Sequence, residues 1–185
     1  MLNALSLLPV IVVLALALSV VVFQAITGVP PMSASAVEAA DVAMLLRQAD
    51  LPEHVVVYDL GCGWGALVMA LSRAFPEAQI RGVEMSPLPY WVARFRTRNM
   101  PNVVLRRGDF YKHPLQDADA VTCYLLIKSM PPLADFLDRT LRPGTPVVSL
   151  AFWFRGRQVS AVRQGAGLLG QAALYYWPAH KADVR

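Results

Sequence analysis

Three carboxylates follow apolar runs of the chain, at places where side chains could do chemistry. They are Asp59, Glu84 and Asp109, and a glycine-rich stretch, Gly61-Cys62-Gly63-Trp64-Gly65, begins two residues after the first of them. Glycines let the backbone turn sharply and approach a ligand closely, and a helix N-terminus behind such a loop favours a negative group. Carboxylates at strand ends can accept hydrogen bonds from hydroxyl and amino groups. The pattern predicts a site for a nucleotide-like ligand.

The spacing of the glycines distinguishes between two kinds of ligand. It is GxGxG rather than the GxGxxG that cradles a dinucleotide pyrophosphate. S-adenosylmethionine (SAM) has no pyrophosphate, and its cationic amino acid end favours a nearby carboxylate such as Asp59. We therefore predict that SAM is the cofactor, with Glu84 accepting from ribose hydroxyls and Asp109 accepting from the adenine amino group. The remaining predicted contacts to the cofactor come from the loop and from strand ends: Gly61, Cys62, Gly63, Gly65, Met85 and Phe110.

Each acid also has an ordinary structural alternative. Asp59 could cap the next turn, Glu84 could cap a helix beginning at Pro87, and Asp109 could start a turn. Capping would have to place an acid at the end of three successive strands independently. A single binding site explains all three positions at once, so we favour the binding site.

The elements that must position these residues alternate between strands and helices. Apolar runs predict strands over 55–61, 79–85, 103–108, 120–127 and 146–152, while helical patterns fall over 67–75, 87–98 and 133–141. An amphipathic helix containing Ala39, Leu45 and Ala49 precedes them, capped by Ser33 or Ser35. This alternation predicts an α/β fold with a parallel sheet covered by helices on both faces.

The C-terminal part follows a different pattern. Residues 158–163 and 172–177 are predicted to be two strands joined by a glycine-rich turn, with no helix between them. We expect an antiparallel hairpin at one edge of a mostly parallel, seven-stranded sheet.

The N-terminal segment carries no charged side chain from Met1 to Val37. Its apolar run over residues 5–25 matches the about 20 residues that span a roughly 30 Å hydrocarbon core. The run is longer than a signal-peptide core and no basic residue precedes it, so we expect a retained anchor rather than a cleaved signal. The expected organisation is a transmembrane anchor over 1–27, a linker over 28–34 and a catalytic domain over 35–185. The domain is placed in the cytoplasm because SAM is made there.

Charge and cysteine content exclude several classes. The formal net charge is +4, and a local cluster comprises Arg94, Arg96, Arg98, Arg106 and Arg107. Such a cluster can bind nucleic acid or an anionic membrane, but we interpret it as a solvated face and predict no nucleic acid partner. Two cysteines do not make a disulfide framework, and three scattered histidines show no ligand spacing, so no metal is predicted.

Three motifs together resemble class I SAM-dependent methyltransferases, which have a Rossmann-like fold. They are D-L-G-C-G-W-G at Asp59, V-E-M-S-P at Val83 and R-G-D-F at Arg107. More narrowly, the chain is similar to membrane-associated protein-lysine N-methyltransferases, including the enzymes acting on the ATP synthase c subunit and the adenine nucleotide translocase. The shared features are a membrane segment, V-V-Y-D-L-G-C-G, the pair Tyr124-Leu125 and L-R-P-G-T-P-V-V-S. Trp64 and Ala66 depart from that group, which usually has Asp and Arg at these positions.

The acceptor follows from the residues after the fourth strand. That strand ends in Tyr124-Leu125 rather than in Asn/Asp-Pro-Pro-Tyr/Phe, the pattern of enzymes that methylate amide or base nitrogens. We expect Tyr124 to line the amine of a lysine in a membrane-associated protein, although it could equally be a core aromatic. Two alternatives remain open: a methyltransferase for a lipid or quinone, and a non-catalytic SAM-binding membrane adaptor.

Overall fold

A seven-stranded mixed sheet forms the centre of the molecule, in a computed structural model that describes residues 4–27, 33–164 and 170–179. The strand order is β3-β2-β1-β4-β5-β7-β6. Their bounds are β1 (Val56–Leu60), β2 (Gln79–Glu84), β3 (Val103–Arg107), β4 (Ala120–Cys123), β5 (Thr145–Leu150), β6 (Ala161–Gln164) and β7 (Gln171–Trp177). The first five strands pair in parallel, so the carboxyl ends of β1, β2, β3 and β4 lie at one edge of the sheet.

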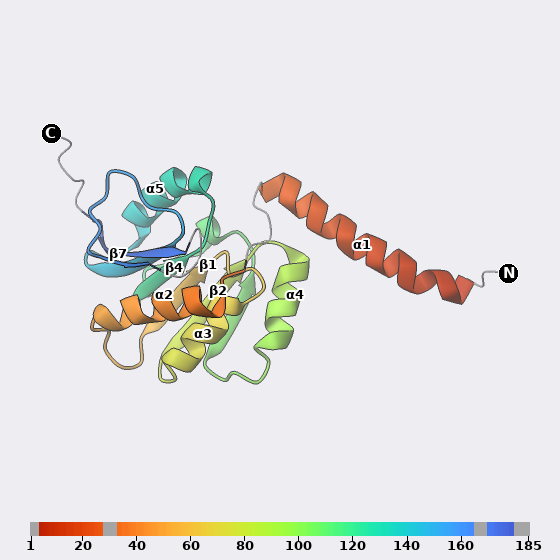
Figure 1. The fold of residues 1–185 in the computed structure, drawn as a ribbon, viewed down its shortest axis with the longest axis horizontal. Helices are drawn as coiled ribbons and strands as arrows, with labels where there is room; N and C mark the ends of the chain where they lie inside the picture. The colour runs from red at the N-terminus through yellow and green to blue at the C-terminus, as the bar shows by residue number, and fades with distance from the viewer. Residues whose placement is uncertain (1–3, 28–32, 165–169, 180–185) are drawn as a thin grey trace.

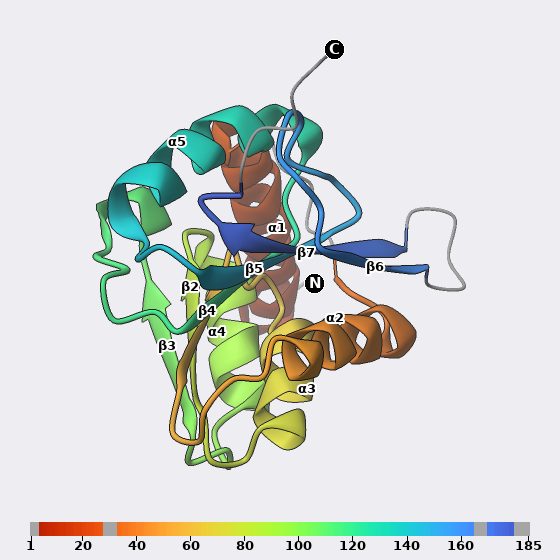
Figure 2. The ribbon, with the colours of Figure 1, turned by 90° about the vertical axis from the view of Figure 1, so that its left-hand side faces the viewer.

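Helices cover both faces, as the alternation predicted. On one face lie α2 (Ala36–Gln48), α3 (Ala66–Ala74) and α4 (Pro87–Arg96), and on the other lies α5 (Met130–Thr140) (Figures 1 and 2). Each face buries its own apolar cluster against the sheet. The Rossmann-like arrangement with a mixed sheet is therefore confirmed.

Local sequence explains where the helices begin. Ser35 accepts from the backbone N–H of Glu38, whose carboxylate accepts from the N–H of Ser35, so α2 starts with a capping box. Helix α5 begins at Met130, three residues earlier than predicted, and β4 stops at Cys123 instead of Ile127. The strand is shorter because the chain forms a 3₁₀ turn, η2 (Ile127–Ser129), within the segment predicted to extend it. The helix begins earlier because prolines are tolerated in the first turn of a helix.

The two C-terminal strands form an antiparallel hairpin at the end of the sheet, with β6 as the edge strand and β7 next to β5. Strand β7 pairs with β5 on one side and with β6 on the other, so the final strand sits inside the sheet. Burial agrees, because Tyr175 and Trp177 are almost fully enclosed. The glycine-rich turn predicted between the two C-terminal strands falls on residues 165–169, which lie outside the described residues.

Helix α1 (Ala4–Thr27) extends away from the domain and contacts α4 (Figure 1). Apolar side chains such as Leu8, Val13 and Leu18 are at least 60% exposed along it. A transmembrane helix was predicted over residues 5–25, yet none of the helices in the described part of the chain is long and apolar enough to cross a membrane. The predicted linker lies mostly in residues 28–32, which are outside the described part.

Candidate functional site

The glycine loop after β1 is held against β2 by backbone hydrogen bonds. The N–H groups of Gly61 and Cys62 both donate to the carbonyl oxygen of Val83, at 2.9 and 3.0 Å. Gly61 has a φ of +74°, and a Cβ there would lie 2.8 Å from Cδ2 of Leu125. Any side chain at this position would be strained and would contact the segment that follows β4. The turn therefore brings the ends of β1, β2 and β4 together.

Glu84 ties this loop to the start of α4. Its Oε2 accepts from the N–H of Gly63 at 2.9 Å, and its Oε1 accepts from the N–H of Ser86 at 2.7 Å. Helix α4 has no side-chain cap, so Glu84 does not cap it as the structural alternative supposed, and the bond to Gly63 places the carboxylate in the loop. Each carboxylate oxygen can accept more than one hydrogen bond, so these contacts leave acceptor capacity for a hydroxyl group of a ligand.

Asp59 is the most enclosed acid of the site, with 2% of its surface exposed. Its pKa is raised from 3.8 to about 7, mainly by burial. The hydroxyl of Thr122 donates a hydrogen bond to Asp59 at 3.1 Å, which lowers the pKa, and the negative charge of Glu84 raises it. Burial, Asp59 and Glu84 also raise the pKa of the Cys62 thiol. A cationic group beside Asp59 would favour its ionised form, so the chemistry of this acid fits the positively charged end of SAM.

Asp109 and Phe110 lie where β3 ends, beside the end of β2. The N–H of Gly108 donates to the carbonyl oxygen of Glu84 at 2.9 Å, so the two strand ends are adjacent. One carboxylate oxygen of Asp109 accepts from the N–H of Tyr111 at 3.0 Å and starts the turn η1 (Phe110–Lys112). The half-buried ring of Phe110 packs on Tyr111, with 4.4 Å between ring centroids. Met85, between the two strand ends, is 36% exposed.

Tyr124 lies directly after β4 and lines a small cavity of 20 Å³ together with Asp59, Gly61, Cys62 and Trp64. Ser33 and Ala34 line the same cavity from the segment before α2. Burial, and then the charge of Glu38, raise the pKa of the Tyr124 phenol above its ordinary value of 10. The phenol is therefore neutral near pH 7.

Trp64 departs from the expected acid in the loop, and the structure shows a different support for this position. Helix α3 begins after Gly65 without a side-chain cap. The guanidinium of Arg96, on α4, donates to the carbonyl oxygen of Trp64 at 2.8 Å. This contact could not be found from the sequence, because 32 residues separate its partners and no local pattern links them. The same holds for Thr122, which approaches Asp59 only through strand pairing.

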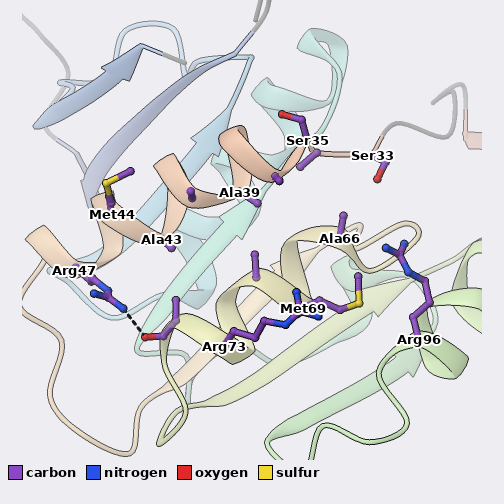
Figure 3. Close-up of a pocket in the computed structure, with 15 residues that line it drawn as sticks. Ser33, Ser35, Ala39, Ala43, Met44, Arg47, Ala66, Met69, Arg73 and Arg96 are labelled. Atoms are coloured by element: carbon purple, nitrogen blue, oxygen red, sulfur yellow. Dashed lines mark hydrogen bonds between the residues drawn. The ribbon is translucent and has the colours of Figure 1, made fainter. Parts of the chain in front are cut away.

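A larger groove of 750 Å³ runs between α2 and α3 (Figure 3). Alanines and two methionines line most of it, and its charged lining residues are all arginines: Arg47, Arg73 and Arg96. Ser33, Ala34 and Ala66 line both this groove and the small cavity beside Tyr124. The groove therefore begins next to the glycine loop. In the part of the chain that the structure describes, no group of His, Cys, Asp and Glu side chains could hold a metal ion.

Comparison with known proteins agrees with this geometry. The model of the ANTKMT methyltransferase domain matches residues 59–161, which include the end of β1, the strands β2 to β5 and all three acids. A protein-lysine N-methyltransferase of Saccharolobus islandicus is 29% identical over 130 residues, which are 67% of this chain and 81% of that protein. A demethylmenaquinone methyltransferase of Staphylococcus aureus is 34% identical over 101 residues, which are half of this chain but only 41% of that protein.

A solved structure supports the fold and the cofactor. An RNA methyltransferase of Salinibacter ruber, crystallised with S-adenosyl-L-homocysteine, superposes with a TM-score of 0.66 and 29% sequence identity. The match covers 77% of this chain and 91% of that chain.

Proposed function

This chain belongs to the family of the ANTKMT methyltransferase domain and is a SAM-dependent methyltransferase, and from that premise we propose that it methylates the side-chain amine of a lysine in a protein. The observation that carries the proposal is the similarity to a protein-lysine N-methyltransferase, which extends over 81% of that protein. Two relatives from other classes, a tRNA methyltransferase and a demethylmenaquinone methyltransferase, are matched over only 32% and 41% of their own length.

We propose the following roles for the residues at the carboxyl ends of the strands. The loop over residues 61–65 and Asp59 hold the amino acid end of SAM, Glu84 holds the ribose, and Asp109 and Phe110 hold the adenine. Support comes from the short distances that join these residues into one edge of the sheet. SAM supplies an activated methyl group, so the chain itself must mainly position the acceptor and exclude water.

The surroundings of Tyr124 suit an amine acceptor. The amine nitrogen forms a bond to the methyl carbon while the bond from that carbon to sulfur breaks, and the amine must first release its proton. Burial lowers the pKa of an amine, so a narrow, half-buried entrance beside Tyr124 favours the neutral form that can react. The aromatic ring and hydroxyl of Tyr124 line and orient the amine, and the released proton passes to solvent.

The groove between α2 and α3 offers a path for the rest of the acceptor protein. It starts at Ser33 and Ala66, beside the small cavity, and its lining of alanines leaves room for a polypeptide segment. Its arginines favour a segment that carries acidic side chains.

We also propose that the domain works at a membrane, held there by α1 and with its catalytic part on the cytoplasmic side. Support comes from the exposed apolar side chains of α1 and from the absence of charge between Met1 and Val37. An attached enzyme meets membrane proteins at a raised local concentration. The same attachment would suit a quinone acceptor, and the S. aureus relative is named for such a reaction.

One experiment separates these acceptors. The full chain is incubated with methyl-labelled SAM and a membrane extract, and the label is then measured in the protein, lipid and RNA fractions. We expect label in protein, on lysine by mass spectrometry, and none after the lysine amines of the extract have been converted to amides by acetylation. Label in the lipid fraction would identify a lipid or quinone acceptor instead, and binding of SAM without any label would identify a non-catalytic adaptor.

A matched pair of variants connects the labelling to the site. Glu84→Ala removes the carboxylate that joins the glycine loop to α4, and we expect it to abolish labelling. Glu77→Ala removes an exposed acid outside the site and should leave labelling unchanged. Full activity in Glu84→Ala would refute the assignment of the ribose contact.

A further inference from the structure

The outer face of α4 combines exposed aromatic rings with arginines. Trp91 is 57% exposed and Phe95 is 65% exposed, and they lie one helical turn apart. Arg94 on α4 and Arg98 in the turn after it contact these rings, with guanidinium carbons 5.7 Å from the Trp91 ring centroid and 4.0 Å from the Phe95 ring centroid. We call these four residues the aromatic–arginine face.

The helix exposes these two rings although it buries other residues on its inner side. Its inward side places Pro89, Tyr90 and Ala93 against the domain. An exposed tryptophan and phenylalanine in adjacent turns cost free energy in water, and a contiguous apolar patch on a surface marks an interaction site.

The segment of the chain that contains this face carries charge of one sign. The chain contains no Asp or Glu between Glu84 and Asp109, and that stretch carries Arg94, Arg96, Arg98, Arg106 and Arg107. The partner of the face must therefore be apolar and negatively charged at once. An anionic lipid surface has this chemistry, because aromatic rings settle at the level of the headgroups while arginines contact phosphates.

The position of α4 agrees with a lipid partner. Helix α1, with its exposed apolar side chains, contacts α4 and extends from the same side of the domain (Figure 1). The aromatic–arginine face thus lies beside the exposed apolar side chains of the helix that we propose to attach the domain to the membrane. Single-stranded RNA would need free ring faces for stacking, whereas Arg98 already lies over the ring of Phe95.

We propose that the aromatic–arginine face of α4 is a second membrane contact, which binds the headgroups of anionic lipids and fixes the orientation of the catalytic end relative to the bilayer. The proposal rests on the membrane attachment through α1 and is independent of the identity of the methyl acceptor. It also replaces the interpretation of the arginine cluster as a merely solvated face, because Trp91 and Phe95 lie among these arginines.

Lipid binding by the full chain tests the proposal without SAM or acceptor. Partitioning onto vesicles of phosphatidylcholine is compared with partitioning onto vesicles that also contain phosphatidylglycerol. Each basic residue near an anionic surface contributes about 1 kcal/mol, or roughly fivefold in affinity, so Arg94→Gln with Arg98→Gln should weaken binding to the anionic vesicles roughly thirtyfold. Binding to phosphatidylcholine, which depends on α1, should not change.

A control variant removes the same charge elsewhere. Arg139 and Arg155 are exposed and lie on α5 and in the loop after β5, so Arg139→Gln with Arg155→Gln should leave the anionic preference intact. An equal loss in both double variants would show that only the net charge matters, and would overturn the proposal. Arg96 is kept in both because it supports the glycine loop.

Fluorescence quenching locates the contact directly. Brominated lipids should quench the emission of the full chain, and Trp91→Phe should remove part of that quenching, whereas Trp153→Phe should not. Vesicle binding without quenching of Trp91 would refute the second contact while leaving attachment by α1 in place. Failure of the full chain to bind any vesicle would refute the attachment itself, and displacement from anionic vesicles by single-stranded RNA would identify a nucleic acid surface instead. The lysine-labelling experiment is unaffected by all three outcomes.

Discussion

Asp59→Asn should change the pH dependence of stability in a defined direction. Burial raises the pKa of Asp59 from 3.8 to about 7, so the folded protein without cofactor holds a proton that the unfolded chain releases above pH 4. The stabilisation from this proton is fully present below pH 4 and is lost as the pH rises through 7. A shift of about three pH units corresponds to roughly 4 kcal/mol, as an upper bound at pH 8.

The asparagine variant keeps the shape of the side chain and stays neutral at every pH. Its stability should match that of the natural protein near pH 4 and exceed it increasingly up to pH 8. For a domain of this size each kcal/mol shifts the melting temperature by about 2–4 °C, so the difference at pH 8 should approach 10 °C. Thermal unfolding followed by circular dichroism between pH 4 and pH 8 measures it.

The control for this measurement is Asp135→Asn, which removes an exposed acid of α5. Its melting temperature should follow that of the natural protein throughout the pH range. Identical pH profiles for the natural protein and Asp59→Asn would show that Asp59 is ionised in the folded state, and the proposed role of its burial would be wrong.

The affinity for the cofactor should depend on pH in the direction opposite to stability, because binding needs the ionised form of Asp59. A cationic ligand beside Asp59 requires the ionised form, so SAM affinity of the natural protein should fall about tenfold for each pH unit below 7. Isothermal titration calorimetry measures this slope. In Asp59→Asn the affinity should be lower at pH 8 and should show no such slope.

Three further variants test individual contacts. Gly61→Ala combines a φ of +74° with a close approach to Leu125, so it should destabilise the domain by about 1–3 kcal/mol in urea unfolding, more than Gly156→Ala, where the φ is +71° and the space is open. Arg96→Gln removes the hydrogen bond to the carbonyl oxygen of Trp64 and should weaken SAM binding by about fivefold in calorimetry. An equal loss of affinity in Arg98→Gln would show that this hydrogen bond is not the cause. Tyr124→Phe should keep most of the methyl transfer rate because the ring that lines the amine remains, whereas Tyr124→Ala should lose at least about tenfold in kcat. Equal losses would show that the hydroxyl, rather than the ring, positions the amine.

Much of the fold could be predicted because its signals are local. The strands β1 and β2 and the helices α3 and α4 begin and end within two residues of the expected positions, since apolar runs, prolines and glycines act on their own neighbours. The predicted start of α5 at Leu133 was wrong, because the two prolines before Leu133 lie in the first turn of the helix, which begins at Met130. The order of the last strands also lay beyond the sequence, because the pairing of β7 with β5 depends on side chains distant in the chain.

The sequence by itself determined the cofactor class, because its evidence is the order of residue types along the chain. Asp59, Glu84, Asp109 and the glycine spacing are visible without any coordinates, and parallel strands must bring such positions to one edge. Only the tertiary structure decided how these residues are supported and what surrounds them. Thr122 reaches Asp59, Arg96 holds the loop at Trp64, and α4 turns its aromatic rings outward beside α1. These contacts join residues far apart in the chain, and their distances follow from packing rather than from any local preference of the backbone.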